Sequence, residues 1–197
     1  MRIKDINKED KLLLSVDDIS KNLSISTESA RVTANRYLKH GILFRIKRNS
    51  YITADKFNTS KENDFFRIAN FIQTPSYISL LSALSYYNIS TQQLQGIVES
   101  VALKRSKSFK VRTREFRYYL VKKGFYCGFL LADIFFIASA EKAFADIIYL
   151  SSLSKYDCDF DAIDFSKINK TGVGRFLENT NKKTLGYWES LCSRYNL

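Results

Sequence analysis

The 197-residue sequence has few of the residues that most often build catalytic or metal centres. It contains one histidine, His40, and three cysteines, Cys127, Cys158 and Cys192, which lie far apart and are odd in number. Histidine-based metal sites, Ser-His-Asp triads, CxxC metal sites and a disulfide framework are therefore excluded. We expect no cofactor, no metal and no catalytic residue, and three unbridged cysteines favour a reducing cytoplasm.

Glycine, proline and long apolar runs are also scarce. Seven glycines and one proline exclude collagen-like and Pro/Gly-rich disordered chains, and 15 Phe with 12 Tyr exclude a disordered tail. The longest apolar run, residues 127–140, is interrupted by Asp133 and is shorter than the roughly 20 residues that a membrane span needs. No apolar signal segment follows residues 1–5, so we expect a cytoplasmic protein without a membrane partner.

The sequence has an excess of positive charge. Its 31 Lys and Arg against 20 Asp and Glu give a net charge of +11, and 45% of its residues are hydrophobic, enough to bury a core. The length suits one large domain or two small ones, and the order of expected elements favours two, residues 1–58 and 62–197. A basic chain of this kind indicates an acidic partner such as nucleic acid.

Residues 15–41 predict two short helices joined by a tight turn. Ser15 is a suitable helix cap, and apolar residues three and four positions apart follow over 16–23. Ser24–Ser26 interrupts that pattern, and a second helix runs over 27–40 to Gly41, which suits the left-handed position past a helix end. Two helices in this arrangement form a helix-turn-helix.

The second helix has an apolar face and a polar face. Ala30, Ala34 and Tyr37 form the stripe expected to pack on the first helix. The opposite face offers short polar groups for base edges, cations for phosphates, and a valine for which a thymine methyl is one partner. The predicted DNA-binding residues of this helix are Thr27, Ser29, Arg31, Val32, Thr33, Arg36 and Lys39. A solvated helix in a packing module would show the same pattern, so the helix alone decides nothing.

A short basic hairpin is expected directly after this helix. Residues 42–46 and 51–52 have strand character, and 47–50 form a basic turn. A hairpin in this position is a wing, which adds Arg45, Lys47 and Arg48 to the predicted DNA contacts. We therefore predict a winged helix-turn-helix in residues 1–58. The alternative is a winged-helix protein-interaction module that binds no operator.

The remainder predicts a mixed α/β domain, which places the whole chain in the α+β class. Helices are expected over 63–71, 75–89, 139–150, 165–179 and 182–195, and strands over 97–103, 116–120, 124–129 and 134–138. The polar segment 55–64 is expected to be a linker, though its last residues can already begin the helix.

Several stretches resemble the antitoxins of AbiE abortive-infection systems, which are type IV toxin–antitoxin systems whose antitoxins are AbiEi family transcriptional regulators. They are residues 15–19, 38–43 and 45–51 in the head, residues 75–84 (PSYISLLSAL) and residues 137–146 (IASAEKAFAD). The resemblance implies an N-terminal winged helix that binds inverted repeats in its own promoter. It also implies a C-terminal domain that opposes a nucleotidyltransferase-like toxin, directly or indirectly, in phage defence. The family usually has Gly in the wing turn where Asn49 and Ser50 stand, and Asn also tolerates a positive φ.

The second domain has a cationic segment of its own. Residues 104–123 carry nine Lys and Arg against Glu115 alone, a net charge of +8. Because like charges repel across neighbouring strands, this imbalance indicates an acidic partner: more DNA backbone, RNA or the toxin. The predicted second basic surface consists of Lys104, Arg105, Lys107, Lys110, Arg112, Arg114 and Arg117.

Other polar clusters have structural explanations. The serines and tyrosine of residues 76–82 suit helix capping and close packing, Glu141 and Lys142 suit a helix start, and the acidic residues of 157–164 lack the Gly and Glu of an EF-hand loop. A nuclease would need a cluster of carboxylates or a histidine at suitable spacing, which we do not find. The sequence therefore favours a non-enzymatic DNA-binding antitoxin that represses its own operon.

Overall fold

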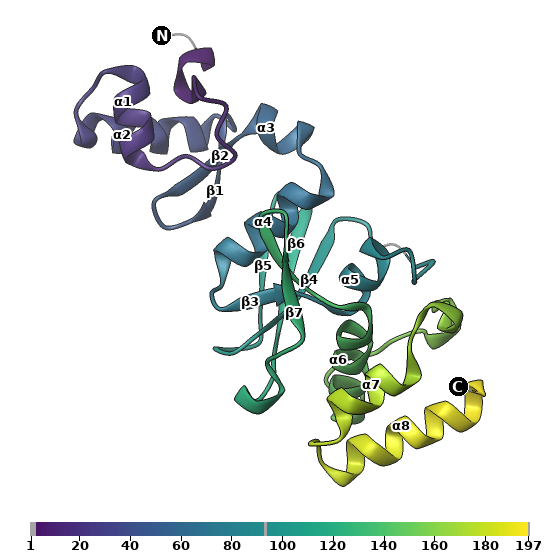
Figure 1. Ribbon diagram of the computed structural model, residues 1–197. Coiled ribbons are helices and arrows are strands. Elements are labelled where there is room, and N and C mark those ends of the chain that lie inside the picture. Colours follow the sequence, from purple (N-terminus) through teal and green to yellow (C-terminus); the bar gives the residue numbers. More distant parts are fainter. Residues whose placement is uncertain (1–2, 93, 197) are drawn as a thin grey trace. The chain divides into compact units, whose positions relative to one another are not determined.

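The computed structural model describes residues 3–92 and 94–196, and the chain divides into two compact units (Figure 1). The first consists of residues up to 68 together with 111–113, and the second of residues 69–110 and those from 114 onward. Helices segregate from strands in the first unit and cover a mixed sheet in the second, which confirms the predicted α+β class.

The first unit contains the predicted helix-turn-helix followed by a hairpin. Its elements are η1 Ile3–Asn7, α1 Val16–Leu23, α2 Thr27–Lys39, β1 Leu43–Lys47, β2 Ser50–Thr53, α3 Ala54–Thr59 and the first turns of α4 Glu62–Ile72. The strands β1 and β2 are antiparallel, and Leu14 adds a third short pairing, because its backbone exchanges hydrogen bonds of 2.8 and 2.9 Å with Tyr51. Leu14 thus joins the segment before α1 to the hairpin.

One continuous apolar core holds these elements together. Ala30 and Ala34 on α2 are fully buried, and their small side chains allow α1 and α2 to approach closely. Around them pack Ile6, Leu14, Val16, Ile19, Tyr37, Leu43 and Tyr51.

Helix α3 lies in the segment predicted as a linker, so that prediction was wrong there. Thr53 caps the helix by accepting a hydrogen bond from the Lys56 N–H (3.2 Å). Phe57 anchors it, because its ring packs edge-on between Phe44 and Phe65 at centroid distances of 5.3 Å. A single apolar residue among polar neighbours gives no helical period, so the sequence pattern did not predict this helix.

The second unit is built on a six-stranded mixed sheet in the order β5-β6-β4-β3-β8-β7. The strands are β3 Ser76–Ile78, β4 Ile97–Ala102, β5 Lys107–Val111, β6 Arg114–Leu120, β7 Phe129–Ala132 and β8 Phe135–Ala138. The helices are α5 Leu80–Tyr86, α6 Ala140–Ser152, α7 Lys170–Leu177 and α8 Lys182–Tyr195, with short turns η2 Lys123–Phe125, η3 Phe160–Ala162 and η4 Phe165–Lys167. Pairs β4–β6 and β3–β8 are parallel, whereas β3–β4 and β7–β8 are antiparallel.

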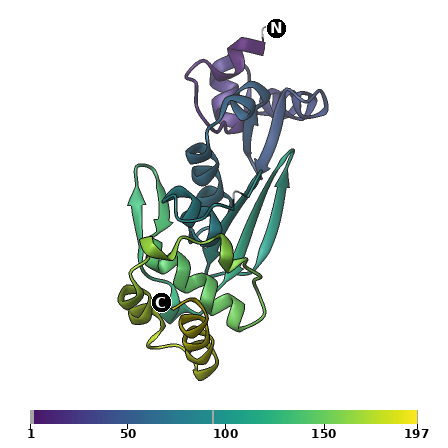
Figure 2. The same ribbon diagram turned by 90° about the vertical axis from the view of Figure 1, so that its right-hand side faces the viewer.

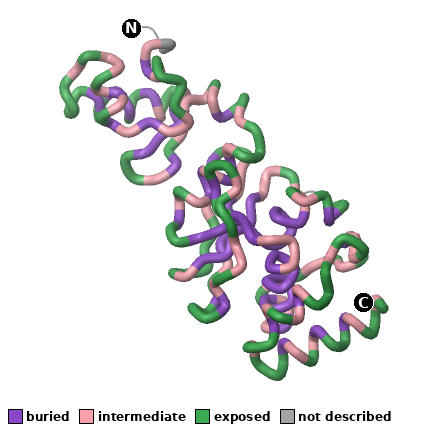
Figure 3. The backbone as a smooth tube through the Cα atoms, viewed as in Figure 1, coloured by how far each residue is buried: buried purple, intermediate pink, exposed green. Residues whose placement is uncertain are grey.

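Helices cover both faces of this sheet (Figure 2). On one face the Tyr118 hydroxyl donates to the Ala69 carbonyl of α4 (2.6 Å). On the other face the Tyr77 hydroxyl donates to Asp146 of α6 (3.0 Å), and α7 and α8 pack against α6 from outside. The central strands and α6 are accordingly the buried part of this unit (Figure 3). The sheet and α6 therefore form its rigid centre.

The run 75–89, predicted as one helix, is divided. Residues Ser76–Ile78 form the central strand β3, and α5 begins at Leu80, whose positive φ of 56° marks the change of direction after the strand. A strand buried on both faces is apolar throughout, so its sequence has no period that distinguishes it from a buried helix.

Two further boundaries were wrong. The predicted strand 124–129 is mostly the turn η2 and a loop, and β7 begins at Phe129, just after Gly128 with its φ of +70°. The predicted helix 165–179 begins only at Lys170, because Asn169 caps it by accepting from the Gly172 N–H (3.2 Å). Helix α8, over Lys182–Tyr195, confirms its prediction.

Candidate nucleic-acid interface

Helix α1 starts at a complete capping box. The Asp18 N–H donates to Ser15 Oγ (3.1 Å), and the Ser15 N–H donates in return to Asp18 Oδ2 (2.8 Å). Lys11 also donates to Asp18 (2.6 Å). Burial alone would raise the pKa of Asp18, but the hydrogen bonds from Lys11 and Ser15 outweigh it and hold that pKa down to about 2. Asp18 is therefore ionised at neutral pH, and its carboxylate accepts the hydrogen bonds that hold the start of α1.

The turn between the helices fixes the start of α2. Ser24 ends α1 in the left-handed conformation, with a φ of 53°. Ser20 Oγ donates to the Ile25 carbonyl (2.6 Å), and Ser26 caps α2 by accepting from the Ser29 N–H (3.2 Å). This turn sets the angle at which α2 leaves α1, and so determines which face of α2 points outward.

Helix α2 presents the predicted polar face to solvent, with one exception. Thr27, Ser29, Arg31, Val32, Arg36 and Lys39 are all exposed. Thr33 is only 8% exposed and lies on the buried side with Ala30, Ala34 and Tyr37. Its side chain cannot reach a duplex, so Thr33 is withdrawn from the predicted contacts. It stands three positions from Ala30 and four from Tyr37, which share its helical face.

The wing turn is tied to the first helix. Residues Arg48 and Asn49 connect β1 to β2, and Asn49 has a φ of +58°, the conformation for which Asn was expected to substitute for Gly. Asn49 Oδ1 also accepts a hydrogen bond from the Val16 N–H (3.1 Å), one of the donors left open at the start of α1. Arg48 stays exposed at the tip.

Arg45 connects the wing to α2. Its Nη2 donates to Asn35 Oδ1 (3.2 Å), and its guanidinium carbon lies 5.9 Å from the centre of the Tyr51 ring. Arg45 is therefore exposed but already engaged, which makes it a positioning residue for α2 more than a free phosphate contact. Asn35 was not among the predicted site residues, because no spacing rule joins a helix residue to a strand residue ten positions later.

Charge is distributed unevenly within the first unit. The segment 27–50, which includes α2 and the wing, has six Lys and Arg against one acid, Glu28. The acidic side chains Asp10 and Asp18 lie outside this segment and pair with Lys56 (2.7 Å) and Lys11 (2.6 Å). The exposed face of α2 and the wing, which we call the basic face, thus carries an excess of positive charge.

The second predicted basic surface is not one surface. Successive residues of a strand point to opposite faces, so Lys107 and Lys110 of β5 diverge, as do Arg114 and Arg117 of β6. The Arg117 side chain pairs with Glu115 (3.1 Å), whose pKa is lowered to about 2 by this hydrogen bond and by one from Ser108. Lys104 and Arg105 are exposed in the loop before β5, and Arg112 is exposed in the turn between β5 and β6.

The position of β5 gives those charges a second explanation. β5 is an edge strand, and lysines on an edge strand hinder unwanted pairing with other strands. Edge protection accounts for the side chains of Lys107 and Lys110 without any acidic partner. The hairpin is therefore a weaker candidate for nucleic-acid contact than the basic face.

A polar cluster lies in the core of the second unit. Lys142 and Asp146 of α6 are both 0% exposed and form an ion pair of 2.5 Å. Tyr77 and Ser79 donate to the other carboxylate oxygen (3.0 and 2.7 Å), and Lys142 Nζ lies 3.5 Å from the centre of the Phe125 ring. Burial raises the pKa of Asp146, and Lys142, Ser79 and Tyr77 oppose that shift.

This cluster joins two of the stretches that carry the family resemblance. Tyr77 and Ser79 come from residues 75–84, and Lys142 and Asp146 from residues 137–146. Opposite charges four positions apart in a mostly apolar helix were the signal for this buried pair, whereas Lys142 was predicted only to suit a helix start. With no exposed atom, the four side chains hold the sheet on α6 and offer no substrate site.

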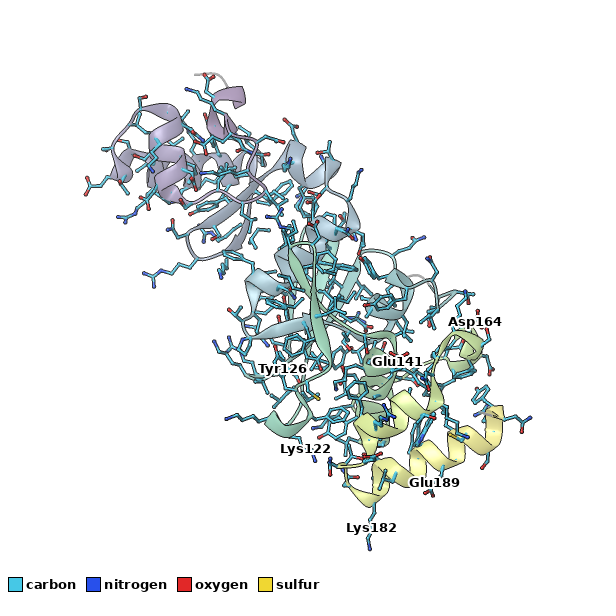
Figure 4. The ribbon with its side chains drawn as sticks, in the orientation of Figure 1. Lys122, Tyr126, Glu141, Asp164, Lys182 and Glu189 are labelled. Carbon is cyan, nitrogen blue, oxygen red and sulfur yellow. The ribbon has the colours of Figure 1, made fainter. Side chains whose placement is uncertain are left out.

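Other polar groups in the second unit have local partners. Figure 4 labels Asp164, whose carboxylate caps η4 and pairs with Lys167 (3.1 Å), and Lys122, which donates to the Asn179 carbonyl (3.3 Å). Within the described part of the chain, no three His, Cys, Asp or Glu side chains gather as metal ligands, and no helix is long and apolar enough to cross a membrane.

Comparisons with known proteins bear on the fold. No family model and no curated protein matches the chain. Among solved structures, it is similar to the crystal structure of the RV2827C protein from Mycobacterium tuberculosis, with a TM-score of 0.61 and 10% sequence identity. The match covers 97% of this chain and 74% of that one. At this identity the likeness extends to the fold alone.

Proposed function

We propose that this chain is a DNA-binding antitoxin that represses its own toxin–antitoxin operon. The observation that supports DNA binding best is the basic face: α2 exposes Arg31, Arg36 and Lys39, and the wing, which Arg45 connects to α2, exposes Arg48. A helix of this kind can lie in the major groove of DNA, where its cations and those of the adjoining hairpin contact the phosphates on either side. Specific contacts would come from the N-terminal half of α2, and non-specific affinity from the cations.

The antitoxin part of the proposal rests on the resemblance to AbiE antitoxins. Two of the resembling stretches, residues 75–84 and 137–146, meet in the Lys142–Asp146 cluster, which supports a shared fold of the second unit. We expect a gene for a nucleotidyltransferase-like toxin directly beside the gene for this chain. Expression of that neighbour should arrest growth, and co-expression of this chain should restore it. The absence of rescue would reject the antitoxin role and leave DNA binding intact.

DNA binding is tested with the duplex that lies upstream of the gene. The full chain should shift this duplex at low salt and favour it over a scrambled duplex of equal length. The double variant Arg36→Ala/Arg48→Ala should bind at least tenfold more weakly. Each lost phosphate contact lowers the number of counterions that DNA releases on binding, and this release favours the complex. The control Arg175→Ala/Lys183→Ala loses the same charge from exposed positions of the second unit and should bind like the unaltered chain.

A winged-helix module that docks another protein is the competing function. It predicts that folded protein shifts no duplex, or that both double variants bind DNA equally. Circular dichroism of each variant establishes folding, so either result counts directly against operator binding.

A further inference from the structure

The outward face of α2 contains an apolar side chain among cations. Val32 is 70% exposed, and it is the one exposed large apolar side chain in the described part of the first unit. Helical spacing places it beside Glu28 and Ser29, four and three positions before, and beside Asn35 and Arg36, three and four positions after. An apolar side chain at the centre of a basic face is left in water unless the partner offers an apolar group.

Duplex DNA offers one such group at the bottom of its major groove. The base edges there present hydrogen-bond donors and acceptors, and thymine alone adds a C5-methyl group. The phosphates that Arg36 and Lys39 can reach lie at the groove walls, so a helix held by those cations points Val32 toward the bases.

The neighbour Asn35 is oriented for the same surface. An arginine only donates hydrogen bonds, so the group that faces Arg45 at 3.2 Å is the amide oxygen of Asn35. The amide nitrogen of Asn35 therefore points away from Arg45, with its two N–H groups free to donate to a base. Thymine presents an acceptor, O4, next to its methyl group, and purines present N7.

We propose that Val32 reads the methyl group of a thymine in the operator, while Asn35, oriented by Arg45, donates to a base acceptor beside it. This inference rests on the proposed DNA binding and names the base that the site selects. Val32 is then a specificity residue, Asn35 a second base contact, and Arg45 a positioning residue that acts through Asn35.

The test starts from a pool of duplexes with a randomised centre, selected with the full chain. The selected sequences should share an invariant thymine. Replacement of that thymine by deoxyuracil removes only the methyl group and should weaken binding about fourfold, the value of one methyl group taken out of water. The same exchange at other thymines should change little.

The variant Val32→Ala keeps one methyl group on a shorter side chain, so it should prefer the thymine duplex over the deoxyuracil duplex less than the unaltered chain does, and its own selection should show a weaker preference at that position. Since Val32 is exposed and Ala favours helices, this variant keeps the fold. Leu131→Ala, which removes an exposed side chain from the second unit, is the matched control and should keep the preference.

Equal binding of both duplexes by the unaltered chain, or an unchanged thymine preference in Val32→Ala, would overturn the inference while operator binding stands. A pool from which the folded chain selects nothing, with no shift at low salt, would instead overturn the proposed function. The two failures are therefore distinguishable.

Discussion

Glu99 is a buried carboxylate that lacks the direct cationic partner that Asp146 has. It is 2% exposed, and it accepts hydrogen bonds from Tyr156 (2.8 Å) and more weakly from Tyr119 (3.4 Å). Burial raises its pKa from 4.5 to about 7, against the opposing effects of Tyr156 and Arg117. The sequence analysis predicted the strand that carries Glu99, but the side chains that face the carboxylate come from Tyr119 and Tyr156, far along the chain, and no local pattern identifies them.

This pKa makes stability depend on pH. Because the folded chain holds the Glu99 proton more tightly than the unfolded chain, the free energy of unfolding should fall as pH rises from about 4.5 to 7 and level off above. Between pH 4.5 and 7, Glu99 should lower the free energy of unfolding by roughly 2–3 kcal/mol, and the variant Glu99→Gln should not show this fall. Urea unfolding of both proteins at several pH values checks it, and parallel profiles would refute the assignment.

The ion pair of Lys142 and Asp146 makes a second prediction at this scale. Lys142→Met leaves a buried carboxylate uncompensated and should destabilise the fold by about 3–5 kcal/mol. The double variant Lys142→Met/Asp146→Leu removes both charges and should recover much of that loss. Denaturant unfolding of the single and double variants measures the coupling, and a double variant no more stable than the single one would contradict this account.

Among the elements, the wing gives the sharpest prediction. Asn49→Ala loses both the hydrogen bond to the Val16 N–H and a side chain that tolerates φ of +58°. Asn49→Gly loses only the hydrogen bond. We expect costs of about 2 kcal/mol for the first and about 1 kcal/mol for the second. Equal losses in denaturant unfolding would show that the conformation of the turn contributes nothing.

The elements also show where the sequence was sufficient. Helices α1, α2 and α8 have caps and a 3.6-residue period, α6 has a cap and an apolar run long enough for a helix, and the predictions of all four were confirmed. Strand β3 was missed because a strand buried on both faces has no period of its own. For the basic face, six of the seven α2 residues predicted from helical spacing are exposed and Thr33 is buried, whereas the Arg45–Asn35 contact depends on how the hairpin packs.

For the whole molecule, the net charge of +11 makes the salt dependence of DNA binding informative. A plot of the logarithm of the binding constant against that of the salt concentration should be steep. Arg36→Ala/Arg48→Ala should reduce its slope by about 1.8, roughly 0.9 for each lost phosphate contact. The control Arg175→Ala/Lys183→Ala should leave the slope unchanged. An equal reduction of the slope in both double variants would indicate attraction by the overall charge of the chain instead of contacts by the basic face.

The most direct measurement of the central claim is a titration of isotope-labelled full chain with the selected duplex, followed by amide NMR shifts. If DNA binds to the basic face, the largest shifts should fall on α2, over Thr27–Lys39, and on the wing residues 45–50. Binding whose shifts fall on β5, β6 or the helices of the second unit, with α2 unmoved, would contradict it.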